Sequence, residues 1–146
     1  MFKHIVIATD GSPASEHAAQ LAVGLARSHG SKLTAVYVVD PYPYLSLGEV
    51  NTLGFQSYMS AAQAQAAQAH ASIESMCKQG GQPVALEVQL VEDVAAASGI
   101  VQAAAKVSAD LIVVGSHGRS GIARLMLGSV STKVVAESQV PVLIAR

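Results

Sequence analysis

The sequence predicts a doubly wound α/β fold, with about five parallel strands and helices on both faces of the sheet. Short apolar runs alternate along the chain with longer segments of helical character, as in a parallel sheet built from β-α-β units. The runs at 4–10 and 110–115 are apolar almost throughout, which is typical of strands buried on both faces. A length of 146 residues suits one core, so we expect a single domain over residues 1–146.

The first strand and helix are marked by their boundary residues. The strand at 4–10 runs into Asp-Gly-Ser-Pro, where Ser12 is a suitable helix cap and Pro13 a suitable first helical residue. Apolar residues then recur at helical spacing until Gly30, and glycine commonly ends helices. A second β-branched run follows at 32–40, so the chain is predicted to open with a strand, a helix and a second strand.

The middle of the chain contains a long connection and a helix of unusual composition. Two prolines and two glycines in residues 41–55 predict a loop of the kind that often borders a functional site. The Ala- and Gln-rich segment at 60–79 has high helix propensity, and Gly80 followed by Gly81 ends it. The segment "VALEVQLV" at 84–91 is predicted to form the third strand.

The last third of the chain continues the alternation. It predicts a helix around 96–107, a strand at 110–115, a helix from about 129 to 138 and a closing strand at 141–146. The strand at 110–115 is joined to the next helix by a glycine-rich loop, which is the most distinctive stretch of the sequence.

Composition narrows the classes of function. The net charge of −1 gives no general attraction to nucleic acid or to an acidic membrane surface, and no stretch reaches the roughly 18 apolar residues of a membrane helix. The single cysteine, Cys77, has no partner for an internal disulfide, and the N-terminus lacks the pattern of a secretory leader, so we expect a cytoplasmic protein. Only 13% of the residues are charged, which favours self-association.

The glycine-rich loop, "GSHGRSGIARLMLGS" at 115–129, has the composition of an anion-binding segment. Glycines let backbone N–H groups approach a phosphate without a Cβ in the way, and the helix that starts near Ser129 adds its first N–H groups and its dipole. Arg119 and Arg124 supply positive charge, and residues 111–136 contain no acidic residue. The alternative is an ordinary strand-to-helix loop with solvated arginines.

The glycine spacing separates this loop from two widespread phosphate loops. It lacks the Gly-Lys-Ser/Thr of a Walker A loop, and the first strand is followed by "DGSPAS" rather than Gly-x-Gly-x-x-Gly. Its own spacing is Gly115, two residues, Gly118, nine residues, then Gly128 and Ser129, with "ADLIVV" before it and "PVLIAR" closing the chain. Together with the opening "IVIATDGSPAS", this pattern closely resembles the ATP-binding branch of the universal stress protein family over nearly the whole chain.

The resemblance implies a Rossmann-like sheet of strand order 3-2-1-4-5, which sets Asp10 beside Gly115, with ATP held between the ends of strands one and four. Residues of the first two strands would line the adenine and ribose, and the loop and next helix would bind ribose and phosphates. The candidate nucleotide-binding residues are then Ala8, Thr9, Asp10, Val38, Gly115, Ser116, His117, Gly118, Arg119, Gly121, Gly128, Ser129, Val130 and Ser131. One departure is that the family's frequent Gly-x-Pro turn is absent at residues 94–96.

Two of these residues have alternative roles. Asp10 could hydrogen-bond a ribose hydroxyl or hold Mg²⁺ beside the phosphates, and its alternative role is to cap the turn into the first helix. No Ser-His-Asp spacing or metal-ligand cluster accompanies His117, so we favour a structural or hydrogen-bonding role for it. We assign no catalytic residue, because the chain has no P-loop lysine. At most, slow ATP hydrolysis or phosphorylation of a loop serine is expected.

The resemblance also implies a homodimer through the last strand, over residues 141–145, which begin at Pro141 and end at Ala145. An apolar strand at a sheet edge is a liability unless it is paired, and the alternative is an edge covered by the chain's own helices. A nucleotide-free dimeric interaction module of the same fold is the alternative function. A phospho-acceptor receiver domain would need clustered acids and a lysine after the last strand, and few aromatic residues (4%) are present to stack on a flavin.

Overall fold

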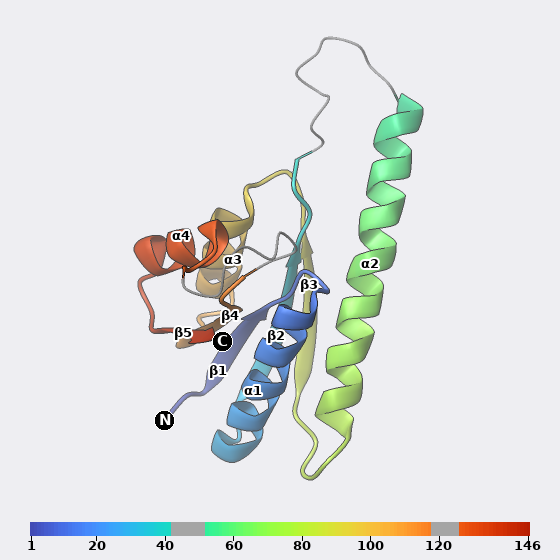
Figure 1. Cartoon of the computed structure of the whole chain (residues 1–146). Coiled ribbons are helices and arrows are strands. Elements are labelled where there is room, and N and C mark those ends of the chain that lie inside the picture. Colours follow the sequence, from blue (N-terminus) through green and yellow to red (C-terminus); the bar gives the residue numbers. More distant parts are fainter. Residues whose placement is uncertain (42–51, 118–125) are drawn as a thin grey trace.

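The computed structural model describes residues 1–41, 52–117 and 126–146, and strands and helices alternate through these ranges (Figure 1). In chain order the elements are β1 (His4–Ala8), α1 (Pro13–His29), β2 (Lys32–Val38), α2 (Thr52–Lys78), β3 (Leu86–Val91), α3 (Ala96–Lys106), β4 (Leu111–Gly115), α4 (Ser129–Glu137) and β5 (Val142–Ala145). The predicted alternation is confirmed, and the start of α2 is the main difference from the expected boundaries.

Within the described ranges, five strands form one parallel sheet in the order β3-β2-β1-β4-β5. The central strand β1 pairs with β2 on one side and with β4 on the other, so Ile5 lies opposite both Leu33 and Leu111. This confirms the expected order 3-2-1-4-5. The direction of winding reverses between β1 and β4, and ligands of such sheets bind beyond the carboxyl ends of the strands at that reversal.

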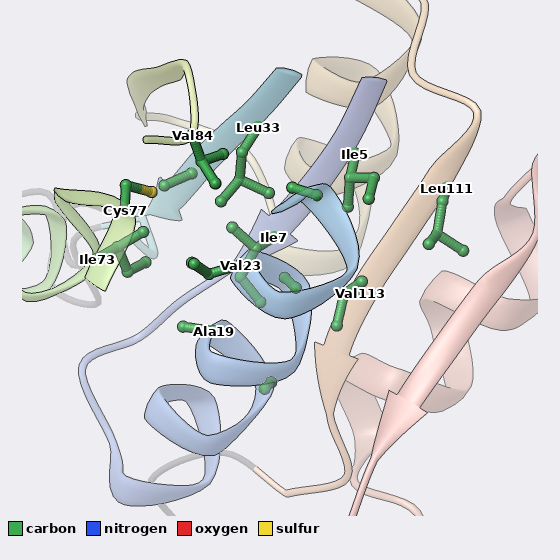
Figure 2. Close-up of a cluster of buried hydrophobic side chains, with 14 of the residues drawn as sticks. Ile5, Ile7, Ala19, Val23, Leu33, Ile73, Cys77, Val84, Leu111 and Val113 are labelled. Atoms are coloured by element: carbon green, nitrogen blue, oxygen red, sulfur yellow. The ribbon is translucent and has the colours of Figure 1, made fainter. Parts of the chain in front are cut away.

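Helices cover both faces of the sheet (Figure 1). α1 and α2 pack on one face, where Ile5 and Ile7 of β1 share a core with Ile73 of α2 (Figure 2). α3 and α4 pack on the other face, where Val6 meets Ile100 of α3. Successive residues of β1 are therefore fully buried in opposite cores, as the continuous apolar run predicted.

α1 begins and ends at the predicted residues. The Ser12 hydroxyl accepts a hydrogen bond from the Ser15 N–H at 3.3 Å, and Pro13 occupies the first helical position. At the other end Gly30 adopts a left-handed conformation with φ of 66°, and its N–H donates to the Ala26 carbonyl oxygen. The predicted cap and the predicted end of α1 are therefore both confirmed.

α2 begins at Thr52 rather than near residue 60, so part of the expected loop is helical. Gly54 and the aromatic residues around it have modest helix propensity, which is why the sequence favoured a loop there. A tertiary contact opposes that preference, because the Tyr58 hydroxyl donates to the carbonyl oxygen of Asp40 at 2.7 Å. Across residues 1–41, 52–117 and 126–146, no helix has the length and apolar character needed to cross a lipid bilayer.

The C-terminal end of α2 is tied to α1 through Arg27. Its Nε donates to the Gln82 carbonyl oxygen at 2.9 Å, and its Nη2 donates to those of Met76 and Gln79 at 3.1 and 2.6 Å. Carbonyl groups at a helix C-terminus lack partners within the helix, so the guanidinium satisfies groups that would otherwise need water. The chain then turns at Gly80, with φ of 78°, as the paired glycines predicted.

Candidate functional site

A cavity of about 530 Å³ opens at the carboxyl edge of the sheet, where β1 and β4 are neighbours. Small-molecule sites commonly have volumes of roughly 300–1,000 Å³. The pairing of Ile7 with Val113 brings the residues that follow β1 to the end of β4, so Asp10 and Gly115 line the same cavity. The expected position of these two residues at one edge is confirmed.

Most of the predicted binding residues that the structure describes line this cavity. They come from the end of β1, the end of β2 and the junction of β4 with α4. Those in the lining are Ala8, Thr9, Asp10, Val38, Gly115, His117, Gly128, Ser129, Val130 and Ser131. Gly118, Arg119 and Gly121 lie outside the described residues. Segments far apart in the sequence therefore meet around one hollow.

The turn between β1 and α1 is shaped by its own side chains. Asp10 Oδ1 accepts a hydrogen bond from the Ser12 N–H at 2.9 Å, and Thr9 Oγ1 accepts one from the Gly11 N–H at 3.2 Å. Thr9 Oγ1 also shares a 3.2 Å hydrogen bond with the Ser15 hydroxyl. Gly11 has φ of 78°, a conformation that favours glycine. Asp10 therefore caps this turn and lines the cavity at the same time.

The junction of β4 with α4 is held by two short hydrogen bonds. The Gly128 N–H donates to the Ser116 carbonyl oxygen at 2.7 Å, and the Ser131 hydroxyl donates to that of Gly115 at 2.6 Å. A Cβ on Gly115 would lie 3.2 Å from the Ala14 carbonyl oxygen, so the strand approaches the start of α1 closely. The end of β4 is thus in tight contact with the start of α1, the helix that follows the neighbouring strand β1.

The N-terminus of α4 opens into the cavity. Its cap residue, Gly128, provides no side-chain hydrogen bond, and the first turn contains no acidic residue. Ser129, Val130 and Ser131 line the cavity, so backbone N–H groups of the first turn lie at its wall. The positive end of the helix dipole lies there too. Both features would stabilise a bound anion.

His117 lies in the cavity wall next to a buried serine. Its Nδ1 is 3.0 Å from the Ser116 hydroxyl, and the Ser116 N–H donates to the Ala145 carbonyl oxygen at 2.8 Å. The Ser116 side chain is buried and is absent from the lining, unlike the other predicted residues of the β4 end. Within the described ranges, no three His, Cys, Asp or Glu side chains gather into a metal site. The contact with Ser116 agrees with the hydrogen-bonding role expected of His117.

Part of the cavity wall was missing from the sequence analysis. It comes from α2, from β2 and the two residues after it, from α3, and from single residues of α1 and β4. These residues are Ser15, Val36, Tyr37, Val39, Asp40, Tyr58, Ala61, Ala62, Gln65, Ala96, Ile100 and Val114. A signal existed in the helical spacing of Tyr58, Ala62 and Gln65. Ala62 and Gln65 lie in the predicted helix at 60–79, but Tyr58 precedes it, so the full spacing is seen only in the longer helix of the structure.

Comparison with known proteins gives a consistent result. The family model described as the universal stress protein family matches residues 1–146. The chain is 38% identical to a universal stress protein of Thermus aquaticus, with 100% of both chains covered. It is 34% identical to one from Methanocaldococcus jannaschii, with 100% of this chain and 83% of the relative covered.

Solved structures share the fold. The universal stress protein UspA from Lactobacillus plantarum gives a TM-score of 0.82 at 26% identity, covering 99% of this chain and 97% of the other. A universal stress protein in complex with cAMP gives 0.70 at 27% identity, with 99% and 97% covered. One from Archaeoglobus fulgidus in complex with dAMP gives 0.69 at 20% identity, with 100% and 98% covered.

Proposed function

The chain belongs to the universal stress protein family, and from that premise we propose that it binds ATP in the cavity between the ends of β1 and β4. The phosphates bind at the N-terminus of α4 and along the glycine-rich loop, and the adenine lies toward β2. We propose that the protein is a dimeric signalling module of the stress response in which ATP is a bound ligand.

The observation that carries this proposal is the position of α4. Its N-terminus lines a cavity at the point where the winding of the sheet reverses, with Gly128 as its cap. A glycine cap leaves the first-turn N–H groups accessible to a ligand, because it brings no side chain to occupy them. A phosphate group is the ligand that such a helix end stabilises best.

The ligands of two structural neighbours support an adenine nucleotide. One neighbour was solved in complex with cAMP and another in complex with dAMP, and both ligands combine adenine with a sugar and a phosphate. The cavity of this chain runs from the α4 end past Asp10 to Val38 of β2. This order matches a nucleotide with phosphates at α4, ribose near Asp10 and base beside β2.

Asp10 is the residue that fits a Mg²⁺ ion bound together with the phosphates. Its Oδ1 accepts from the Ser12 N–H, which fixes the carboxylate at the cavity wall. Mg²⁺ is usually held by one or two carboxylates plus phosphate oxygens and water, and a lone acidic residue suits that arrangement. The ion would neutralise phosphate charge, while Asp10 orients it.

We also propose that two copies of the chain associate through β5. This strand lies at the edge of the sheet, and Val142, Leu143 and Ile144 remain partly exposed. α1 and α4 both contact β5, and they expose Leu21 and Val135 respectively. Pairing of two β5 edges would cover the strand's open hydrogen-bonding groups and bury apolar surface.

A nucleotide-free interaction module is the alternative, and calorimetric titration with ATP, ADP and AMP separates the two functions. We expect ATP to bind with a dissociation constant well below millimolar, and mass spectrometry of denatured protein should detect any nucleotide that copurifies. If none of the three nucleotides binds below about 1 mM, corresponding to about 4.1 kcal/mol, ATP binding is excluded and the interaction module is favoured.

A further inference from the structure

The cavity continues beyond the proposed phosphate and ribose positions to α2. Tyr58, Ala61, Ala62 and Gln65 line it at the spacing of a single helix face. α2 is long, and its first half extends past the carboxyl ends of the strands (Figure 1). This half of the helix therefore borders the hollow at the carboxyl edge of the sheet.

The same face of α2 is buried farther along the helix. Ala66, Ala69, Ile73 and Cys77 continue the spacing and are buried, the last two in the core against α1 and the sheet (Figure 2). In the first half, Tyr58 and Ala62 pack against Tyr37 and Val39 and also line the cavity, so this part of the face is shared between protein and the hollow. A helix normally turns its apolar face toward buried surface, so a bound molecule would complete the packing of the first half.

Two hydrogen bonds join this wall to β2 and to the residues that directly follow it. The Tyr58 hydroxyl donates to the Asp40 carbonyl oxygen at 2.7 Å, and the Tyr37 hydroxyl donates to Gln65 Oε1 at 3.4 Å. Between these ties α2 presents Ala61 and Ala62, whose small side chains leave space in front of the end of β2. We call this part of the cavity the slot; along α2 its lining consists of two alanines between a phenol and an amide.

We propose that α2 recognises the base of the nucleotide, with the adenine packed on Ala61 and Ala62 and in contact with Tyr58 and Gln65. The inference rests on the proposed ATP binding, because phosphates at α4 leave only the base to reach this end of the same cavity. A purine has apolar faces and polar edges, which suit alanines together with a phenol and an amide. Occupancy of the site then stabilises the first half of α2.

The test compares two leucine substitutions on opposite faces of α2. Ala62→Leu fills the slot, whereas Ala67→Leu places the same side chain on an exposed face that does not line the cavity. Each variant is titrated with ATP and with inorganic triphosphate, which has no base. We expect Ala62→Leu to weaken ATP binding by about tenfold or more and to leave triphosphate binding unchanged. Ala67→Leu should bind both ligands as the unchanged chain does.

Hydrogen exchange of the unchanged chain provides a readout that does not depend on the folding of a variant. ATP should slow exchange in residues 52–65, and inorganic triphosphate should leave those residues unaffected. Equal ATP affinity in a folded Ala62→Leu variant overturns the inference, and so does exchange in residues 52–65 that ATP does not change. If the unchanged chain binds triphosphate and ATP with equal affinity, the phosphate site is supported and recognition of the base by α2 is excluded. If the unchanged chain binds neither ligand, the proposed ATP binding is excluded, and recognition of the base is excluded with it.

Discussion

The hydroxyl group of Ser131 donates a 2.6 Å hydrogen bond to the backbone carbonyl oxygen of Gly115. This contact joins the first turn of α4 to the last residue of β4. Gly128 adds a second link, since its N–H donates to the Ser116 carbonyl oxygen at 2.7 Å. The helix end that we propose to bind phosphate is therefore positioned by the strand that ends at the switch in winding.

Removing the first of these links should affect both stability and binding. Ser131 is buried, so Ser131→Ala leaves the Gly115 carbonyl without its hydroxyl donor and should lower the free energy of unfolding by about 1 kcal/mol. ATP binding should weaken because the first turn of α4 loses its anchor. Urea unfolding and calorimetry measure the two effects, with Ser28→Ala on the exposed surface of α1 as the control. Unfolding and binding unchanged from the original chain would contradict the anchoring role.

A side chain added at Gly115 should destabilise the fold, whereas a side chain added at Gly24 should not. A Cβ on Gly115 would meet the Ala14 carbonyl oxygen at 3.2 Å, so Gly115→Ala should lower the free energy of unfolding by about 1–3 kcal/mol. Gly24 lies inside α1 with nothing within 4 Å of the added Cβ. Gly24→Ala should raise the free energy of unfolding by about 0.5–1 kcal/mol. Thermal or urea unfolding measures both changes in the free energy of unfolding. Equal changes for the two substitutions would show that the close approach at Gly115 is unimportant.

A negative charge at the start of α4 should separate binding from folding. Ser129→Asp places a carboxylate where phosphate is proposed to bind, so ATP affinity should fall by about tenfold or more. The same carboxylate interacts favourably with the helix dipole, so the melting temperature should not fall. Ala136→Asp adds an equal charge near the other end of the helix and should leave ATP affinity unchanged. If both aspartate variants bind ATP equally well, the phosphates lie elsewhere.

His70 should make stability dependent on pH. Burial lowers the pKa of His70 below its ordinary value of 6.5, and its Nε2 has no hydrogen-bond partner within the described part of the chain. The unfolded chain therefore takes up a proton that the folded chain does not, as pH falls below 6.5. The stability associated with neutral His70 is complete above that pH and is lost as pH falls toward the folded-state pKa.

The measurement for His70 is the free energy of unfolding at about pH 7.5 and about pH 5.5, in the original chain and in His70→Leu. The original chain should lose more stability between the two conditions, because leucine cannot take up a proton. All other residues are the same in both proteins, so their contributions cancel in the comparison. An identical loss in the two proteins would show that His70 does not contribute to the pH dependence of stability.

The sequence predicted the fold well because its local signals agree with the tertiary structure. The buried run of β1, the Ser12 cap and the Gly30 terminus each have one strong physical preference, and the structure satisfies all three. The start of α2 was wrong because Gly54 lowers helix propensity while the Tyr58–Asp40 contact acts only after folding. Of the cavity wall on α2, only Tyr58 lies outside the predicted helix at 60–79.

The sequence predicted the part of the candidate site that lies at the strand ends, where backbone groups and glycine residues form the cavity wall. The residues at the ends of β1 and β4 line one cavity because strand order alone brings them together. Gly118, Arg119 and Gly121 stay predictions, since they lie outside the described residues. Side chains of α2 contribute through a register that depends on how the whole helix packs, which short-range patterns do not specify.

The most direct test of ATP binding in this cavity is to record backbone amide resonances by NMR while ATP is added. We predict the largest chemical-shift changes at Thr9 after β1, at Gly115 and at Ser129 to Ser131 of α4, because these residues line the cavity where the ribose and phosphates are proposed to bind. The amides of β3, at the far edge of the sheet, should change little. Changes confined to β3 or to the second half of α2, or no changes at saturating ATP, would contradict binding in this cavity.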